Sequence, residues 1–137
     1  GEVALSGTAS GSHIHFEVRV APNDYDSTLN PELWLIPHPG NGTLAFQFLD
    51  KSGISIHPVE TKVQYYPEPD HPSARDYYPE VYSFEALISI PPFQETAALG
   101  DLAAGRYRIT FVWAGVLYER WVEIQPGKLT RVMFVVK

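Results

Sequence analysis

At 137 residues, the chain has the length of one ordinary domain with a modest appendage, enough to bury a core without disulfides or metals. Aromatic residues make up 13% of the chain and charged residues 19%, a balance that predicts a packed fold and excludes a disordered tail. The formal charge of -6, without a block of consecutive Lys or Arg, gives no electrostatic basis for binding nucleic acid or an anionic membrane.

Cysteine is absent, which excludes disulfides and thiolate metal sites. No apolar run approaches the roughly 18 residues of a membrane span. The chain starts at Gly1 with neither Met nor a charged-then-apolar leader, so we expect Gly1 to be an internal point of a longer protein. An export signal would then lie upstream of it.

The first predicted strand spans residues 13–20, where apolar and polar residues alternate and successive side chains point to opposite faces. Its apolar face holds Ile14, Phe16, Val18 and Val20, and its polar face holds His13, His15, Glu17 and Arg19. A polar loop over residues 21–28 and a short apolar segment over residues 30–36 follow. The Pro/Gly cluster at residues 37–42 then predicts a linker.

Beyond this linker, period-two alternation predicts seven strands and no helix. The pattern favours an all-β fold, in which residues 43–137 form an antiparallel, two-sheet β-sandwich. The strands are expected at residues 43–49, 54–56, 62–66, 81–90, 106–114, 117–124 and 129–136. Their predicted core faces hold Leu44, Phe46, Phe48, Tyr82, Phe84, Ile88, Ile90, Tyr107, Ile109, Phe111, Trp113, Val132, Phe134 and Val136.

His13-Ile14-His15 is the candidate for chemistry, because residues i and i+2 of a strand point to the same face and can converge on one centre. Neutral imidazole is a natural zinc ligand, and a catalytic zinc needs three protein ligands and a water. Judged by spacing alone, such a pair is more often a surface pair or a hydrogen-bonded pair than a metal site.

Two segments of the chain resemble the last two strands and the tail of the lysostaphin-like (LytM-type) zinc metallopeptidases. They are Gly7-Thr8-Ala9-Ser10-Gly11-Ser12-His13-Ile14-His15-Phe16-Glu17-Val18-Arg19 and Asn30-Pro31-Glu32-Leu33-Trp34-Leu35. The resemblance implies that His15 ligates zinc and that His13 acts beside the metal as a base or transition-state stabiliser. Glu17 and Arg19 match the pattern too, and we interpret them as a solvent-facing strand pair.

The family's other two zinc ligands come from an upstream H-x-x-x-D motif, which this chain lacks. The remaining histidines, His38, His57 and His71, are followed four residues later by Gly42, Thr61 and Arg75. One imidazole ligand and a neighbour cannot hold a catalytic zinc tightly. We therefore expect zinc in the intact parent protein, and neither retained zinc nor hydrolysis in this chain alone.

The second part of the chain resembles carboxypeptidase-regulatory or transthyretin-like β-sandwich modules. The similar stretches are Leu99 to Ile109, Val122 to Lys128 and an opening hairpin from Leu44 to Val59. This resemblance implies an Ig-like or transthyretin-like sandwich of about seven strands and says little about a ligand.

Residues 65–82 depart from that pattern, because five tyrosines surround a Pro-rich acidic loop over residues 67–80: Tyr65, Tyr66, Tyr77, Tyr78 and Tyr82. Such rings can stack on sugars and would suit a wall-polysaccharide binder, but we favour ordinary packing that ties down the loop. The acidic pairs Asp24 with Asp26 and Asp70 with Asp76 lack the dense oxygen-ligand spacing of a calcium site, and we interpret them as solvated.

These patterns predict the C-terminal region of a secreted zinc metalloendopeptidase that acts on bacterial cell-wall peptidoglycan outside the cytoplasm. Residues 1–36 would be the end of the peptidase domain, residues 37–42 a linker and residues 43–137 a non-catalytic accessory module. The unpaired apolar face of residues 13–20 predicts packing on the module or self-association. The alternative is a free-standing binding or adhesion module whose H-x-H pair is coincidental.

Overall fold

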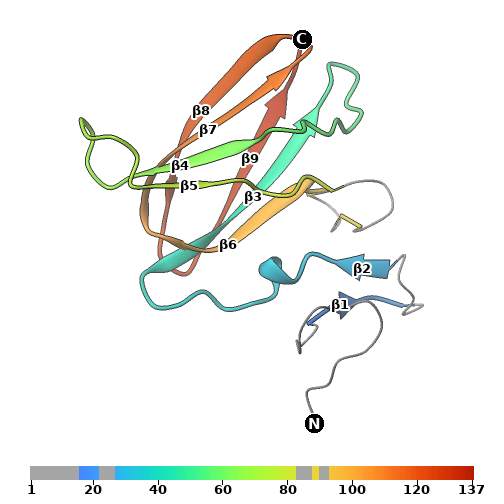
Figure 1. Ribbon diagram of the computed structural model, residues 1–137. Coiled ribbons are helices and arrows are strands. Elements are labelled where there is room, and N and C mark those ends of the chain that lie inside the picture. The colour runs from blue at the N-terminus through green and yellow to red at the C-terminus, as the bar shows by residue number, and fades with distance from the viewer. Residues whose placement is uncertain (1–15, 22–26, 83–87, 90–92) are drawn as a thin grey trace, which may run out of the picture.

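The computed structural model describes residues 16–21, 27–82, 88–89 and 93–137 (Figure 1). These residues form strands and one short 3-10 turn but no α-helix, so the predicted all-β class is confirmed. The strands are β1 (Val18–Arg19), β2 (Thr28–Leu29), β3 (Asn41–Leu49), β4 (Lys62–Tyr66), β5 (Arg75–Tyr77), β6 (Ala97–Ala103), β7 (Gly105–Trp113), β8 (Val116–Ile124) and β9 (Leu129–Val135). The 3-10 turn η2 spans Pro31–Leu33.

Three sheets organise these strands, and most of their pairs are antiparallel. The first sheet holds β1 and β2, the second has the order β6-β3-β9 and the third has the order β5-β4-β7-β8. The exception is β3, which pairs in parallel with β9 from Thr43 opposite Leu129 to Leu49 opposite Val135. The expectation of a purely antiparallel module is wrong here, because alternation along a strand carries no information about the direction of its neighbour.

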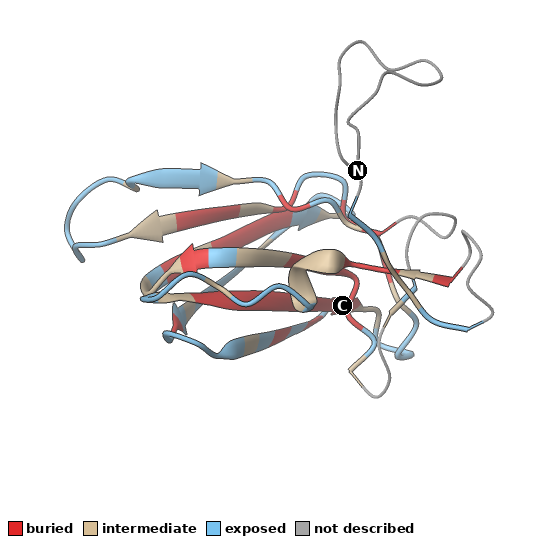
Figure 2. Cartoon of the chain, turned by 90° about the horizontal axis from the view of Figure 1, so that it is seen from below, coloured by how far each residue is buried: buried red, intermediate tan, exposed pale blue. Residues whose placement is uncertain are grey.

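The two larger sheets share one hydrophobic core, to which β3, β4, β6, β7, β8 and β9 all contribute. Its centre is aromatic: the Phe111 ring meets the Phe48 and Phe134 rings edge to face, with centroid distances of 4.9 Å in both pairs. Edge-to-face geometry of this kind adds to the stabilisation from buried area. Figure 2 shows the buried residues concentrated along the inner strands of the module.

Most of the predicted core residues that the structure describes are buried. The exceptions are Ile88, which is 37% exposed, and Trp113, which is only half-buried. Phe84 and Ile90 lie outside the described residues. Ile88 is exposed because it makes a single bridge to Leu29 of β2 rather than standing in a strand of the core.

Three strands are absent from the sequence prediction. Strand β2 begins at the end of a predicted loop, β5 lies inside the segment expected to be a long loop, and β6 lies in a stretch for which no strand was predicted. Conversely, residues 54–56 form only one bridge, between Ser55 and Leu49. The side chain of Asp50 accepts hydrogen bonds from the amides of Ser52 and Ile54, which holds this segment in a turn rather than in a longer strand.

The N-terminal arm, which we define as residues 16–21 and 27–40, lies beside the second sheet, with the β1–β2 ribbon at the bottom of Figure 1 and η2 between it and β6. The turn η2 contacts both β6 and β3. A Cβ added at Gly100 of β6 would come within 3.2 Å of the Glu32 Cβ, so the arm and the strand are in close contact there. The part of the arm around η2 therefore packs against the module formed by the two larger sheets.

Candidate functional site

The two histidines of the candidate zinc pair, His13 and His15, lie outside the described residues, and the described part of their motif begins at Phe16. Strand β1 pairs antiparallel with β2, with Val18 opposite Leu29. Because β2 leads directly into residues 30–35, the described end of the first segment lies near the start of the second.

Glu17 and Arg19 form an ion pair on one side of β1. The Arg19 Nε donates a hydrogen bond to Glu17 Oε2 at 2.8 Å, and a second guanidinium nitrogen contacts the same oxygen. Both side chains are partly exposed. This geometry agrees with the interpretation of the two residues as a strand pair on the polar face.

The tail segment that follows β2 is organised around Asn30, which is buried and precedes η2. Its side-chain oxygen accepts a hydrogen bond from the amide of Glu32 at 3.0 Å, and Pro31 occupies the first position of the turn, where no amide donor is needed. The Glu32 carboxylate in turn accepts a hydrogen bond from the amide of Gly100 in β6. Asn-Pro-Glu thus shapes the tail and attaches it to the module.

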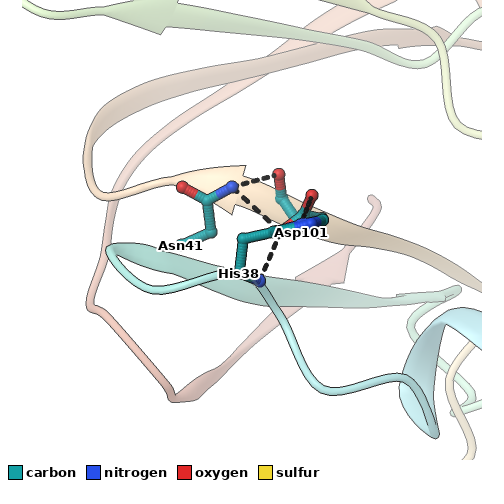
Figure 3. Close-up of polar contacts among 3 residues, drawn as sticks. All are labelled: His38, Asn41 and Asp101. Atoms are coloured by element: carbon teal, nitrogen blue, oxygen red, sulfur yellow. Dashed lines mark hydrogen bonds and ion pairs between the residues drawn. The ribbon is translucent and has the colours of Figure 1, made fainter.

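A second attachment joins the end of the arm to β6 through Asp101 (Figure 3). The Asp101 carboxylate accepts hydrogen bonds from the backbone amide of His38 at 2.8 Å and from the Asn41 side-chain amide at 2.9 Å. Its other oxygen lies 2.7 Å from Nδ1 of the His38 ring. We call His38, Asn41 and Asp101 the junction cluster. The His38 amide, with smaller contributions from Asn41 and the His38 ring, holds the pKa of the Asp101 carboxyl below its usual value.

The junction cluster pairs an imidazole with a carboxylate, but its geometry is that of a structural contact. The His38 side chain is 82% exposed, so its ring has no enclosed space in which to act on a substrate. Among the residues that the structure describes, no group of three or more His, Cys, Asp or Glu side chains could hold a metal ion. The junction cluster is therefore not an enclosed acid–base pair, and the described residues hold no such group of metal donors.

The structure describes only one of the two acidic pairs that were considered for calcium binding. Asp24 and Asp26 lie outside the described residues, and Asp70 is exposed. Asp76 is not simply solvated, because it accepts hydrogen bonds from the Lys62 amine at 2.7 Å and from the Gln64 side-chain amide at 3.1 Å. The Lys62 contact lowers the pKa of Asp76, and the same contact raises the pKa of Lys62. Asp76 is thus engaged in holding β4 and β5 together.

The five tyrosines of residues 65–82 do not form one aromatic surface. The Tyr65 ring stacks on the Tyr107 ring with a centroid distance of 4.9 Å, and Tyr77 also packs near Tyr107. Burial raises the pKa of the Tyr107 phenol. Tyr82 is buried, and Tyr66 lies beside Trp121.

Only Tyr78, at 69% exposure, presents its ring to solvent. Ordinary packing therefore accounts for the other four tyrosines, as the sequence interpretation favoured. The exposed ring of Tyr78 is the part of this segment that packing does not explain.

None of the protein-family models searched matches the chain, and no curated protein matches it. Within the described ranges, no helix is long and apolar enough to cross a membrane. The likeness to lysostaphin-like peptidases accordingly depends on residues 7–19 and 30–35 alone.

Proposed function

We propose that this chain is the C-terminal region of a secreted zinc metalloendopeptidase that hydrolyses bacterial cell-wall peptidoglycan. Residues 1–36 are the end of its lysostaphin-like peptidase domain, and residues 43–137 are a non-catalytic accessory module. The observation that carries the proposal is the pair of matching segments, residues 7–19 and 30–35. The pairing of Val18 with Leu29 is consistent with it, since it places the end of the first segment beside the residue that precedes the second.

In the parent, His15 is a zinc ligand and His13 lies beside the metal, while an upstream H-x-x-x-D motif supplies the other two ligands. Zinc would provide a Lewis acid and a bound water with a pKa lowered to about 7. This chain's own residues do not complete that site, because its other histidines stand in no H-x-x-x-D motif and the described residues hold no further donor cluster. Hydrolysis therefore belongs to the parent.

We assign the two larger sheets to the Ig-like or transthyretin-like β-sandwich type. Sheets of three and four strands that share one core support this assignment. In this arrangement the module holds the tail of the peptidase domain through Glu32 and Asp101, which suits a structural support for a catalytic domain.

The test compares the intact parent with residues 1–137. The parent is expected to contain one zinc per chain by elemental analysis and to release peptides from purified peptidoglycan, whereas residues 1–137 do neither. Replacing His15 by Ala in the parent should remove both zinc and activity. The His38→Ala variant is the matched control, because His38 is an exposed histidine of the junction cluster, and it should retain both.

One tightly bound zinc per chain in residues 1–137 would contradict the expectation that this chain alone retains no metal. A parent that has no His–Asp pair upstream of this region would overturn the peptidase assignment. The second candidate, a free-standing binding or adhesion module, would then take its place. One observation favours that candidate: the described part of the arm is held on the module, as expected for a single folded unit. It predicts binding to cell walls without hydrolysis.

A further inference from the structure

A cleft of about 520 Å³ opens where β4 leaves the side of β7. The two strands stay paired only as far as Lys62 opposite Thr110, while β7 continues to Trp113 with β8 on its other side. The space beside the end of β7 is lined by residues 59–62, 78–79, 110–112 and Leu117. We call this space the β4–β7 cleft.

The walls of the β4–β7 cleft carry apolar side chains that no other part of the described chain covers. Val59, Val112 and Leu117 are all more than half exposed, and the ring of Tyr78 stands at the same opening. Single exposed apolar side chains are ordinary, but several of them around one cleft mark a binding site. The other tyrosines of this segment pack or lie beside other rings, so the exposure of Tyr78 is specific to the cleft.

The cleft also holds a polar group that the fold leaves unused. Thr61 is only 2% exposed, and its hydroxyl has no hydrogen-bond partner among the described residues. A buried hydroxyl without a hydrogen-bond partner destabilises the folded protein. Thr61 lines the cleft but its hydroxyl oxygen is sealed from solvent, so the cleft has to widen for a hydroxyl or amide of a bound ligand to reach it and remove this destabilisation.

The charges around the cleft restrict the ligand. The Lys62 amine is paired with Asp76 at 2.7 Å and lies 5.9 Å from the centroid of the Tyr78 ring. With Lys62 neutralised in this way, Glu60 leaves one net negative charge at the cleft, which disfavours an anionic ligand. A purely apolar ligand, in turn, would leave the Thr61 hydroxyl unpaired.

A sugar ring meets all of these conditions, because it has an apolar face of C–H groups that stacks on an aromatic ring and a rim of hydroxyls that donate and accept hydrogen bonds. We propose that the β4–β7 cleft binds a neutral oligosaccharide, with one ring stacked on Tyr78 and its hydroxyls directed to Thr61 and Lys62. The identity of the sugar, an N-acetylated glycan of the cell wall, rests on the proposed function.

The first experiment titrates residues 1–137 with the tetramer of N-acetylglucosamine and, separately, with a free tetrapeptide of the peptidoglycan stem. Heteronuclear NMR should show shifts at Thr61, Tyr78 and Leu117 with the sugar and none with the peptide. Tyr78→Ala should weaken sugar binding about tenfold through the loss of stacking, and Tyr78→Phe should largely preserve it. Tyr66→Ala is the control, since Tyr66 lies beside Trp121 outside the cleft, and it should bind like the wild type.

A second variant separates binding from stability. Thr61→Val keeps the shape of the side chain and removes the unpaired hydroxyl, so it should raise the unfolding temperature and at the same time weaken the binding of the sugar. If Thr61 had only a structural role, Thr61→Val would change the unfolding temperature without weakening the binding of the sugar.

The proposal is overturned by absence of sugar binding, by binding that Tyr78→Ala leaves unchanged, or by shifts at the cleft with the peptide in place of the sugar. Zinc content and hydrolysis of the parent test the peptidase assignment separately. The proposal of sugar binding can therefore be overturned while the peptidase assignment holds, and the peptidase assignment can be overturned while the cleft still binds a glycan.

Discussion

Asp101 combines an unusual backbone with a dense set of contacts. Its φ of 52° lies in the left-handed region, which Asp tolerates better than most residues. In that conformation its carboxylate accepts from the His38 amide and from Asn41, and its backbone carbonyl also accepts from the Asn41 side chain. One residue thus fixes the end of the arm against β6.

The attachment at Asp101 should depend on pH in a defined direction. Because the folded protein lowers the pKa of Asp101, its contribution to stability is present above the usual carboxyl value of 3.8 and is lost as the pH falls through the lowered pKa. Hydrogen exchange of the His38 amide, measured from pH 6 downward, should accelerate beyond the intrinsic rate in that range. Asp101→Asn should remove this pH step, and a step of unchanged size in the variant would assign it to another group.

The sequence predicted the burial of some single residues but not the long-range contacts of others. Alternation places Leu44, Phe46 and Phe48 on one face of their strand, and all three are buried, although Thr43, Ala45 and Gln47 of the opposite face are buried as well. Asp101 and Glu32 were not singled out as contact residues, since their partners are distant in sequence and no local pattern encodes such pairs. His13 and His15 remain predictions, because they lie outside the described residues.

At the scale of elements, four strands of the module were predicted closely, whereas the longest prediction, residues 81–90, has no strand at its described residues 81–82 and 88–89. Strand β4 has the predicted bounds, β8 and β9 differ from theirs by one residue at one end, and β7 differs by one residue at each end. The missed strand β5 has three residues and pairs with β4 over Val63–Tyr65, so it is too short for a periodic signal. Strand β6, with the sequence Ala97–Ala103, has small residues and a Gly in place of the β-branched residues that indicate strands.

Strand β3 supplies the centre of the aromatic core, and its Phe48 should carry a large share of the stability. The Phe48 side chain is fully buried and packs on the rings of Phe46, Phe111 and Phe134. Phe48→Ala should lower the free energy of unfolding by about 3–5 kcal/mol through lost burial and a cavity. Chemical denaturation measures this loss.

The matched control for Phe48 is Val135→Ala in the neighbouring strand β9, where the side chain is more than half exposed. Its effect should stay within about 0.5 kcal/mol. Equal losses in the two variants would show that the aromatic cluster is not the centre of the core.

At the scale of the whole molecule, the arm is divided into a held part and an exposed part. Residues around η2 contact the module, whereas Phe16, two residues before β1, is 58% exposed. The sequence predicted that the apolar face of residues 13–20 would pack on the module or on a second copy. Because Phe16 and Val20 of that face are exposed, we propose association between copies through β1 and the residues beside it.

Light scattering of residues 1–137 at increasing concentration tests this association. The wild type is expected to dimerise, and Phe16→Ser should shift the equilibrium toward the monomer because an exposed aromatic ring is removed from the contact. Trp34→Ser, which changes an exposed ring elsewhere on the arm, is the control and should dimerise like the wild type. A wild-type chain that stays monomeric at every concentration would contradict the proposal.

The parallel pairing of β3 with β9 has a mechanical consequence. Strand β3 starts directly after the arm, and β9 runs alongside it in the same direction toward Lys137. A pull between the arm and Lys137 therefore draws the two strands past each other along their length. All the hydrogen bonds between them share that force and must break together, whereas strands peeled apart from one end lose their bonds one by one. In the proposed cell-wall peptidase, such a shear-resistant pair of strands would keep the module folded while the catalytic domain is under tension.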